Sequence, residues 1–177
     1  MSDRKGLVTF KGSPITLRGG EVKLGAKAPK FSALANDLSV KTLADYQGKV
    51  VIISSVPSLD TGVCDTMTRR FNVEAGKLGD KAVVLTVSRD LPFAQKRWCG
   101  AADAKNIVAL SDFRERDFGK KYGLEIADGP LAGLLARAVL VVDQAGKVAY
   151  QEIVKEIATE PNYDAAIAEA QKLMQTA

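Results

Sequence analysis

The sequence predicts a three-layer α/β sandwich with a central mixed β-sheet and a β-hairpin near its N-terminus. The run over residues 50–56 is apolar and β-branched without polar alternation, which is typical of a strand buried on both faces. From there to residue 123, strand patterns alternate with helix patterns, and the chain closes with a hairpin and a helix. We find no linker, repeat or low-complexity stretch, so residues 1–177 are predicted to form a single domain.

The N-terminal part of the chain is predicted to be mostly extended. In residues 7–17, alternating apolar residues flank a turn that contains glycine and proline, which predicts a β-hairpin extension. Further along, the pattern predicts an extended stretch over 27–34, a turn at Asn36-Asp37, and one short helical turn over 42–48.

The rest of the chain alternates between predicted strands and predicted helices. The buried strand ends at Pro57, and a helix is expected from about Gly62 to Leu78. The remaining predicted strands are 82–88, 107–110, 138–143 and 147–154, and the remaining helices are 92–98, 114–122 and 162–175. The helix over 162–175 carries an apolar stripe along one face.

Composition excludes several classes of protein. The hydrophobic fraction of 46% and the charged fraction of 26% are ordinary for a soluble globular chain. The net charge of +4 comes from scattered basic residues, so we expect no nucleic-acid binding. No apolar run approaches the ~20 residues that cross a bilayer, and the first residues lack the apolar stretch of a secretory signal. We therefore expect a cytoplasmic protein without membrane contact.

The absence of histidine narrows the chemistry further. It excludes Ser-His-Asp and Cys-His catalytic sites, zinc sites built on histidine, and haem held by a proximal histidine. Two cysteines alone cannot form a four-cysteine cage, so we expect no metal, and no motif indicates a bound cofactor. Any reaction must use cysteine, lysine, arginine, tyrosine or a carboxylate.

Cys64 is the strongest candidate for a reactive residue. It is expected in the first turn of the helix that follows the buried strand, where unpaired backbone N–H groups and the helix dipole favour a thiolate, the nucleophilic form. Thr61 lies three residues earlier, close enough for its hydroxyl to reach the sulfur or a substrate oxygen. Pro57 fixes the exit from the strand and is expected to shield the sulfur from water.

A reactive thiolate also needs a fixed positive charge, and no imidazole can supply one. Arginine is permanently cationic and carries several donors on a planar fork. Arg137 directly precedes the strand that begins at Ala138, so we expect it to be held on rigid scaffolding at a sheet edge.

The two cysteines also have simpler interpretations. A free cysteine is most often a small buried apolar residue, although a position at a helix start is not what such a residue needs. Cys99 is expected at or near the end of the helix over 92–98, beside Gly100, where local unwinding is cheap. The cysteines are 35 residues apart, so they do not form a C-x-x-C motif. A static disulfide and a weak metal site remain open alternatives at this point.

The pattern Pro57-x-x-x-Thr61-x-x-Cys64 resembles the peroxidatic signature of the peroxiredoxins. The chain is more closely similar to the thiol peroxidase branch, whose members are atypical 2-Cys peroxiredoxins. Besides residues 57–64, the similar motifs are 90–95 leading to Cys99-Gly100, 127–131 with 136–138, and 159–161.

The resemblance implies a thioredoxin-like fold and the reduction of hydrogen peroxide and organic hydroperoxides to water and alcohols. It implies that Cys64 is the peroxidatic cysteine, which becomes a sulfenic acid, and that Cys99 resolves it as an intramolecular Cys64–Cys99 disulfide. Thr61 and Arg137 match the side chains that bind peroxide and stabilise the thiolate, and Pro57 matches the shielding proline. The resemblance also implies re-reduction by thioredoxin and a homodimer.

Two further expectations and two alternatives complete the prediction. Asp65 and Thr66 directly follow the nucleophile, and an acid there could temper the thiolate. Because a disulfide requires the two Cα atoms within about 4.4–6.8 Å, we expect a helix turn to loosen, with the helix of Cys99 the one that gives way.

Two alternative functions remain. One is a general thiol–disulfide oxidoreductase, which the wide cysteine spacing disfavours, and the other is a non-catalytic binding domain.

Overall fold

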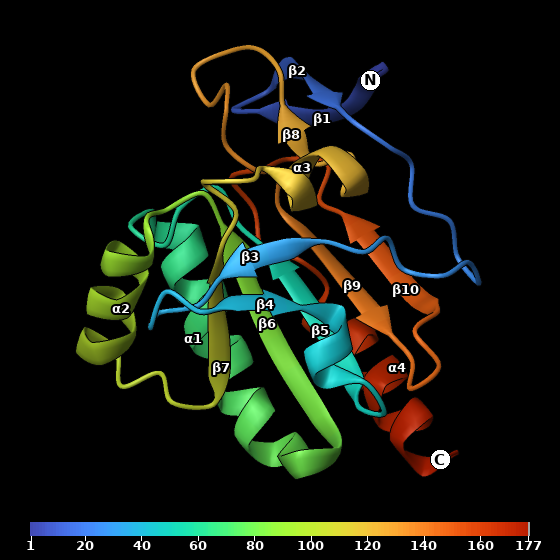
Figure 1. Cartoon of the computed structure of the whole chain (residues 1–177). Helices are drawn as coiled ribbons and strands as arrows, with labels where there is room; N and C mark the ends of the chain where they lie inside the picture. The colour runs from blue at the N-terminus through green and yellow to red at the C-terminus, as the bar shows by residue number, and fades with distance from the viewer. Residues whose placement is uncertain (177) are drawn as a thin grey trace.

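The computed structural model describes residues 1–176, so that only Ala177 lies outside the described residues. Its centre is a seven-stranded sheet in the order β10-β9-β5-β6-β7-β3-β4 (Figure 1). The strands of this sheet are β3 Ser32–Leu34, β4 Val40–Thr42, β5 Val50–Ser55, β6 Ala82–Ser88, β7 Ile107–Ser111, β9 Ala138–Val142 and β10 Val148–Ile153.

The pairing is mixed, as the sequence predicts. β5, β6 and β7 run parallel to one another, whereas β9 pairs with β5 and β10 pairs with β9 in the antiparallel sense. All six residues of β5 are buried. Val50 and Ile52 belong to one apolar cluster, and Val51 and Ile53 belong to the other, so each face of the strand packs against its own layer.

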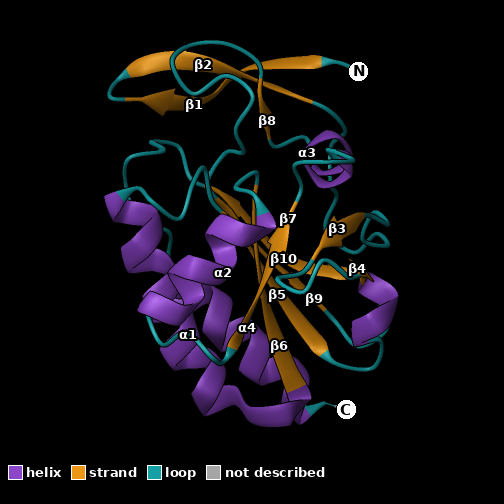
Figure 2. Ribbon diagram, turned by 60° about the vertical axis from the view of Figure 1, so that its left-hand side comes forward, coloured by secondary structure: helices purple, strands orange, loops and turns teal. Residues whose placement is uncertain are grey.

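Helices cover both faces of this sheet, which confirms the predicted sandwich (Figure 2). The cluster on one face contains residues of α1 Gly62–Leu78, α2 Pro92–Ala101 and α4 Tyr163–Gln175. The cluster on the other face contains Phe118 and Tyr122 of α3 Asp117–Tyr122, with the 3₁₀ turn η1 Leu43–Tyr46 packed against it. Within residues 1–176, no helix combines the length and the apolar character needed to span a bilayer.

The N-terminal hairpin forms a small second sheet. It consists of β1 Asp3–Phe10 and β2 Ser13–Arg18, joined by β8 Glu125–Ile126, which the sequence did not indicate. The turn of this hairpin is fixed to the segment after β10, because the Glu156 carboxylate accepts hydrogen bonds from the Thr9 hydroxyl at 2.6 Å and from the Lys11 amide at 2.8 Å. The hairpin is therefore anchored rather than free.

Several predicted boundaries were wrong. α2 continues to Ala101 and not only to residue 98, and Cys99 lies in its last turn, near the helix end as predicted. α3 begins at Asp117 and not at residue 114, because Arg116 adopts a left-handed conformation with φ of 55°. The predicted extended stretch 27–34 is a strand only from Ser32. By contrast, the helix over 62–78 and the strand over 82–88 have the predicted bounds.

Candidate functional site

One edge of the central sheet collects the predicted site residues. β5 and β6 are parallel, so their carboxyl ends meet there, and the antiparallel strand β9 begins at the same place: Ser55 pairs with both Val87 and Ala138. The loop that leads to Cys64 leaves from β5, and the chain that leads to α2 leaves from β6. Arg137 immediately precedes β9. Binding sites of α/β sheets form outside the carboxyl ends of their strands, and the candidate residues lie at such an edge.

Cys64 is the third residue of α1, whose N-cap is Thr61. Its exposed fraction is 0%, and it packs in the apolar cluster that also contains Leu59, Met67 and Phe71. The structure therefore combines the two interpretations of this residue, since the sulfur is buried and also lies in the first turn of a helix. Among residues 1–176, the cation that is hydrogen-bonded to it is Arg137, whose Nη2 donates to Sγ at 3.4 Å.

Arg137 is a buried guanidinium, with an exposed fraction of 2%. Its Nε donates to the carbonyl oxygen of Ile157 at 2.8 Å, Nη1 donates to Sδ of Met67 at 3.4 Å, and Nη2 donates to Cys64. No carboxylate of residues 1–176 lies within ion-pair distance of it. Of its three partners, only the Cys64 sulfur can carry a negative charge.

An inner strand of the sheet holds Arg137 in place. The residue immediately precedes β9, which lies between β10 and β5. The backbone carbonyl of Arg137 accepts a hydrogen bond from the Val154 amide at 3.0 Å. Backbone and guanidinium are thus both held by the segment that follows β10.

Thr61 is oriented differently from the expectation. Its side chain is exposed, and its hydroxyl donates to the Ser58 carbonyl at 2.9 Å. Within residues 1–176 it makes no hydrogen bond to the Cys64 sulfur, and it caps none of the amides of α1. The N–H groups of the first turn are therefore left for an anionic oxygen. Gly62 borders open space, since a Cβ atom there would meet no atom within 4 Å.

Pro57 is buried directly after β5, in a loop that Asp90 fixes. One carboxylate oxygen of Asp90 accepts from the Ser58 hydroxyl at 2.7 Å, and the other accepts from the Leu59 amide at 2.9 Å and the Ser88 hydroxyl at 2.7 Å. Sequence reasoning missed this role. The available signal was the position of Asp90 two residues after β6, the strand that pairs with the one from which the Cys64 loop departs.

Cys99 lies in the last turn of α2 and is half-buried. Burial raises the pKa of the Cys99 thiol above its ordinary value, and a hydrogen bond with the Asn36 side chain opposes that shift. Both cysteines are free thiols in the structure. The predicted Cys64–Cys99 disulfide is thus absent from this form of the protein.

A three-residue cluster joins the helices of the two cysteines. Asp65 accepts a hydrogen bond from Nε1 of Trp98 at 2.9 Å, and its other oxygen accepts from Nε of Arg69 at 2.9 Å. The Arg69 guanidinium lies 5.6 Å from the centre of the Trp98 ring, within reach of a cation–π contact. The sequence singled out Asp65, but its partner on α2 could not be read from it.

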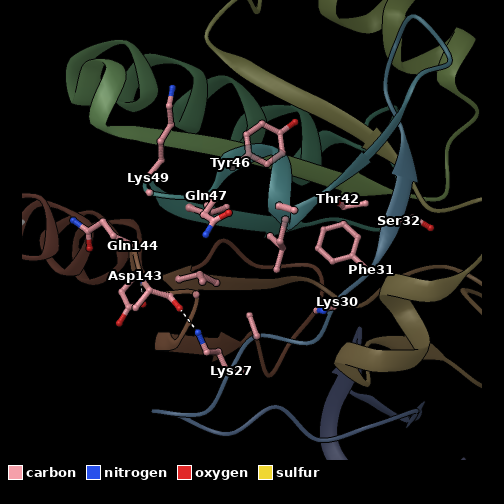
Figure 3. A pocket seen from close by; sticks show the side chains of 18 of the residues that line it. Lys27, Lys30, Phe31, Ser32, Thr42, Tyr46, Gln47, Lys49, Asp143 and Gln144 are labelled. Carbon is pink, nitrogen blue, oxygen red and sulfur yellow. Dashed lines mark hydrogen bonds between the residues drawn. The ribbon is translucent and has the colours of Figure 1, made fainter.

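A cavity of about 600 Å³ lies at the other end of β5, away from the cysteines (Figure 3). Phe31, Val51 and Val142 line it, and Lys27 donates to the carbonyl of Ala145 beside it. None of the predicted site residues contributes to its wall. The candidate chemistry is therefore concentrated at the opposite edge of the sheet.

Comparison with known proteins finds relatives over most of the chain. Residues 23–167 match the family model described as Redoxin. The chain is similar to the thiol peroxidase of Bacillus subtilis, with 53% identity over 94% of this chain and 98% of that one. It is also similar to the thiol peroxidase of Halalkalibacterium halodurans, with 56% identity over 90% of this chain and 94% of that one.

Solved structures confirm the thioredoxin-like arrangement. A peroxiredoxin-like protein from Aquifex aeolicus matches with a TM-score of 0.89 at 45% identity, covering 96% of this chain and 99% of that one. A thiol peroxidase from Chromobacterium violaceum matches with a TM-score of 0.85 over 96% of this chain and 98% of that one. Its identity is 23%, so that likeness concerns the fold alone.

Proposed function

The chain belongs to the redoxin family, among the peroxide-reducing thiol peroxidases of the peroxiredoxin type, and from this premise we propose that Cys64 is the peroxidatic cysteine and Cys99 the resolving cysteine. The observation that carries the proposal is the burial of Arg137 without a carboxylate partner in residues 1–176, in contact with the Cys64 sulfur. An isolated buried cation costs several kcal/mol. A thiolate at Cys64 removes that cost, and the cation in turn stabilises the thiolate.

In the proposed first step, the Cys64 thiolate attacks the terminal oxygen of a hydroperoxide ROOH. The O–O bond breaks, the sulfur is oxidised to a sulfenic acid, and the other oxygen leaves as RO⁻, which takes up a proton to become ROH. Arg137 and the uncapped amides at the start of α1 are the groups that stabilise the charge on the departing oxygen. Thr61 is exposed beside the open space at Gly62, where it can orient a peroxide that enters there.

In the proposed second step, the Cys99 thiol condenses with the sulfenic acid. The product is the Cys64–Cys99 disulfide and one water molecule, which takes the sulfenic oxygen. Both helices are intact in the reduced structure, so the last turn of α2 must loosen before the sulfurs meet. A dithiol then reduces the disulfide by thiol exchange, and we propose thioredoxin as that reductant.

The substrates, compartment and assembly belong to the same proposal. The apolar residues around Cys64 favour organic hydroperoxides alongside hydrogen peroxide. A cycle that is completed by a dithiol fits the reducing cytoplasm. Leu91, Phe93 and Phe113 are large apolar side chains exposed after β6 and β7, and they are the surface we propose for a homodimer. Sedimentation of the parent chain and of Phe93→Glu tests the dimer.

The burial of Cys64 argues against a general thiol–disulfide oxidoreductase, because a protein disulfide cannot reach a fully buried sulfur. A small hydroperoxide is much smaller than a protein disulfide and needs a much smaller opening to reach the sulfur. The contact between the buried Arg137 cation and the Cys64 sulfur argues against a non-catalytic domain, in which this contact would have no role.

The test is rapid reaction of the reduced protein with one equivalent of a hydroperoxide, with free thiols counted per chain. We expect two thiols lost, no crosslink between chains, and no peroxide consumption in Cys64→Ser. Peroxide consumption that survives in Cys64→Ser overturns the assignment of Cys64. Loss of two thiols through a crosslink between chains overturns the intramolecular pairing.

A further inference from the structure

We propose that the hydrogen bond from Trp98 to Asp65, supported by Arg69, is a latch that holds the helix of Cys99 closed, and that its opening sets the rate of disulfide formation. The inference rests on the proposed roles of Cys64 and Cys99. It assigns Asp65, Trp98 and Arg69 as positioning residues, which act on the reaction through the two cysteines and do not touch the peroxide.

The latch residues flank the two sulfurs in the chain. Asp65 follows Cys64 on α1, and Trp98 precedes Cys99 on α2. Neighbouring residues of an α-helix point about 100° apart, because a turn contains 3.6 residues. While Trp98 faces α1, the adjacent Cys99 side chain must therefore point in another direction, and it lies half-buried at the margin of the apolar cluster.

The same geometry holds on the other helix. Asp65 points toward α2, whereas Cys64 points into the core against Arg137. Cys64 lies inside the apolar cluster and Cys99 packs at its margin, and both are free thiols. A disulfide requires the Cys99 turn to shift until the two sulfurs meet. The Asp65–Trp98 bond fixes the adjacent residue of that turn to α1 and therefore opposes the shift.

Three contacts favour the closed state. Trp98 is 7% exposed, its indole N–H is hydrogen-bonded to a carboxylate, and the Arg69 guanidinium lies over its ring. Hydrogen bonds to charged groups are among the stronger ones in proteins, but the Asp65 side chain is partly exposed, which weakens this one. Loss of the N–H donor should shift the opening equilibrium by about tenfold.

The delay has a chemical consequence. A sulfenic acid that waits for Cys99 remains open to a second peroxide, which oxidises it irreversibly to a sulfinic acid. The latch thus keeps the reduced site well ordered, but by delaying the disulfide it makes the protein more sensitive to over-oxidation. A variant without the latch should resist a peroxide excess better than the parent.

The variants that test this are Trp98→Phe, which keeps an aromatic ring and removes the donor, and Asp65→Ala, which removes the acceptor. Glu74→Ala is the matched control, because it also removes a carboxylate that pairs with an arginine on α1, but it lies away from α2. Stopped-flow mixing with peroxide separates the sulfenic step from the disulfide step, and thermal unfolding checks that each variant is folded.

We expect disulfide formation to be about tenfold faster in Trp98→Phe, with an unchanged peroxide step and less sulfinic acid by mass spectrometry. Asp65→Ala should show the same acceleration, and the double variant should be no faster than either single one, because all three remove one interaction. Glu74→Ala should match the parent. Trp98 is the single tryptophan, so its emission should change with the disulfide step.

Equal disulfide rates in the parent and Trp98→Phe, or additive effects in the double variant, would overturn the latch. Slower disulfide formation in Trp98→Phe would also overturn it, by showing that the bond positions Cys99 for attack. If the parent chain itself loses only one thiol per chain, the proposed pairing of the cysteines fails, and that result is visible before any variant is compared.

Discussion

At the start of α1, Cys64 lies fully buried with a guanidinium against its sulfur, whereas Cys99, in the last turn of α2, is half-buried and no cation of residues 1–176 is hydrogen-bonded to its sulfur. The loop before Cys64 is fixed by the Asp90 carboxylate, and Arg137 is fixed by Ile157. The turn of Cys99 contains Gly100, which faces open space. The comparison teaches that the two sulfurs are held differently: one is fixed in the core against a cation, and the other belongs to a helix turn that borders open space.

The largest expected effect separates the two cysteines directly. Cys99→Ser should still react once with peroxide at the parent's rate and then stop, because the sulfenic acid has no thiol in the chain to condense with. Turnover with thioredoxin should fall to background. Mass spectrometry should find one added oxygen, and two after excess peroxide. Sustained turnover equal to the parent's would remove the distinction between the two sulfurs.

A change at Arg137 tests the cation that contacts the Cys64 sulfur. Arg137→Met is expected to slow the peroxide step by about 10²–10³, the usual cost of losing a group that stabilises transition-state charge. Stability should fall by only about 1 kcal/mol, because the change removes the hydrogen bond to the Ile157 carbonyl and leaves the Cys64 sulfur as a neutral thiol rather than an unpaired charge. Stopped-flow kinetics and urea unfolding measure the two quantities. A much larger loss of stability alongside the fall of rate would instead indicate that Arg137 mainly supports the fold.

The surroundings of Cys99 predict that the rate of disulfide formation depends on pH. Burial raises the pKa of the Cys99 thiol above its ordinary value of 9.0, so near neutrality this group is protonated. The thiolate fraction then rises with pH, and disulfide formation should accelerate up to about tenfold per pH unit between about pH 6 and pH 8. Rapid-quench thiol counting in that range measures it. A rate that stays constant would show that ionisation of Cys99 is not needed for resolution.

The smallest expected effect concerns the segment that supports Arg137. Hydrogen bonds from Thr9, Gly12, Lys11 and Ala158 lower the pKa of Glu156 from 4.5 to about 2. A lowered pKa means that this carboxylate adds stability above about pH 4.5 and that the contribution disappears as the pH falls toward 2. Glu156→Gln should therefore unfold at slightly lower urea than the parent at neutral pH.

The control for that prediction is the same pair of proteins in acid. The two urea midpoints should converge as the pH falls toward 2, where the parent carboxylate becomes protonated. A difference that persists there would mean that shape rather than charge anchors the hairpin. The peroxide step should be unaffected at neutral pH, since Arg137 keeps its bond to Ile157.

The fold was predictable where periodicity and helix signals are strong, as for the buried strand β5 and for α1. It was not predictable where two or three residues form a strand only because a neighbour pairs with them, as in β4 and β8. Gly100 suggested a helix end, but it faces open space in the last turn, and the helix continues through it to Ala101. Tertiary contacts decide such positions.

The sequence indicated the residue types of the site and their place at one sheet edge. It could not indicate partners that meet only in three dimensions, such as Asp65 with Trp98 or Arg137 with the carbonyl of Ile157. Nor could it show that the Thr61 hydroxyl turns to Ser58 and leaves the first amides of α1 uncapped. These contacts join residues from different elements, and spacing along the chain carries no information about them.

The central claim is that the buried Arg137 guanidinium is neutralised by a thiolate at Cys64. The most direct test is the ultraviolet absorbance of the thiolate in Cys99→Ser at neutral pH, with the variant lacking both thiols as the blank. We predict close to one thiolate per chain, which is lost when Arg137→Met is added. A protonated sulfur at neutral pH in Cys99→Ser, with Arg137 in place, would contradict the account.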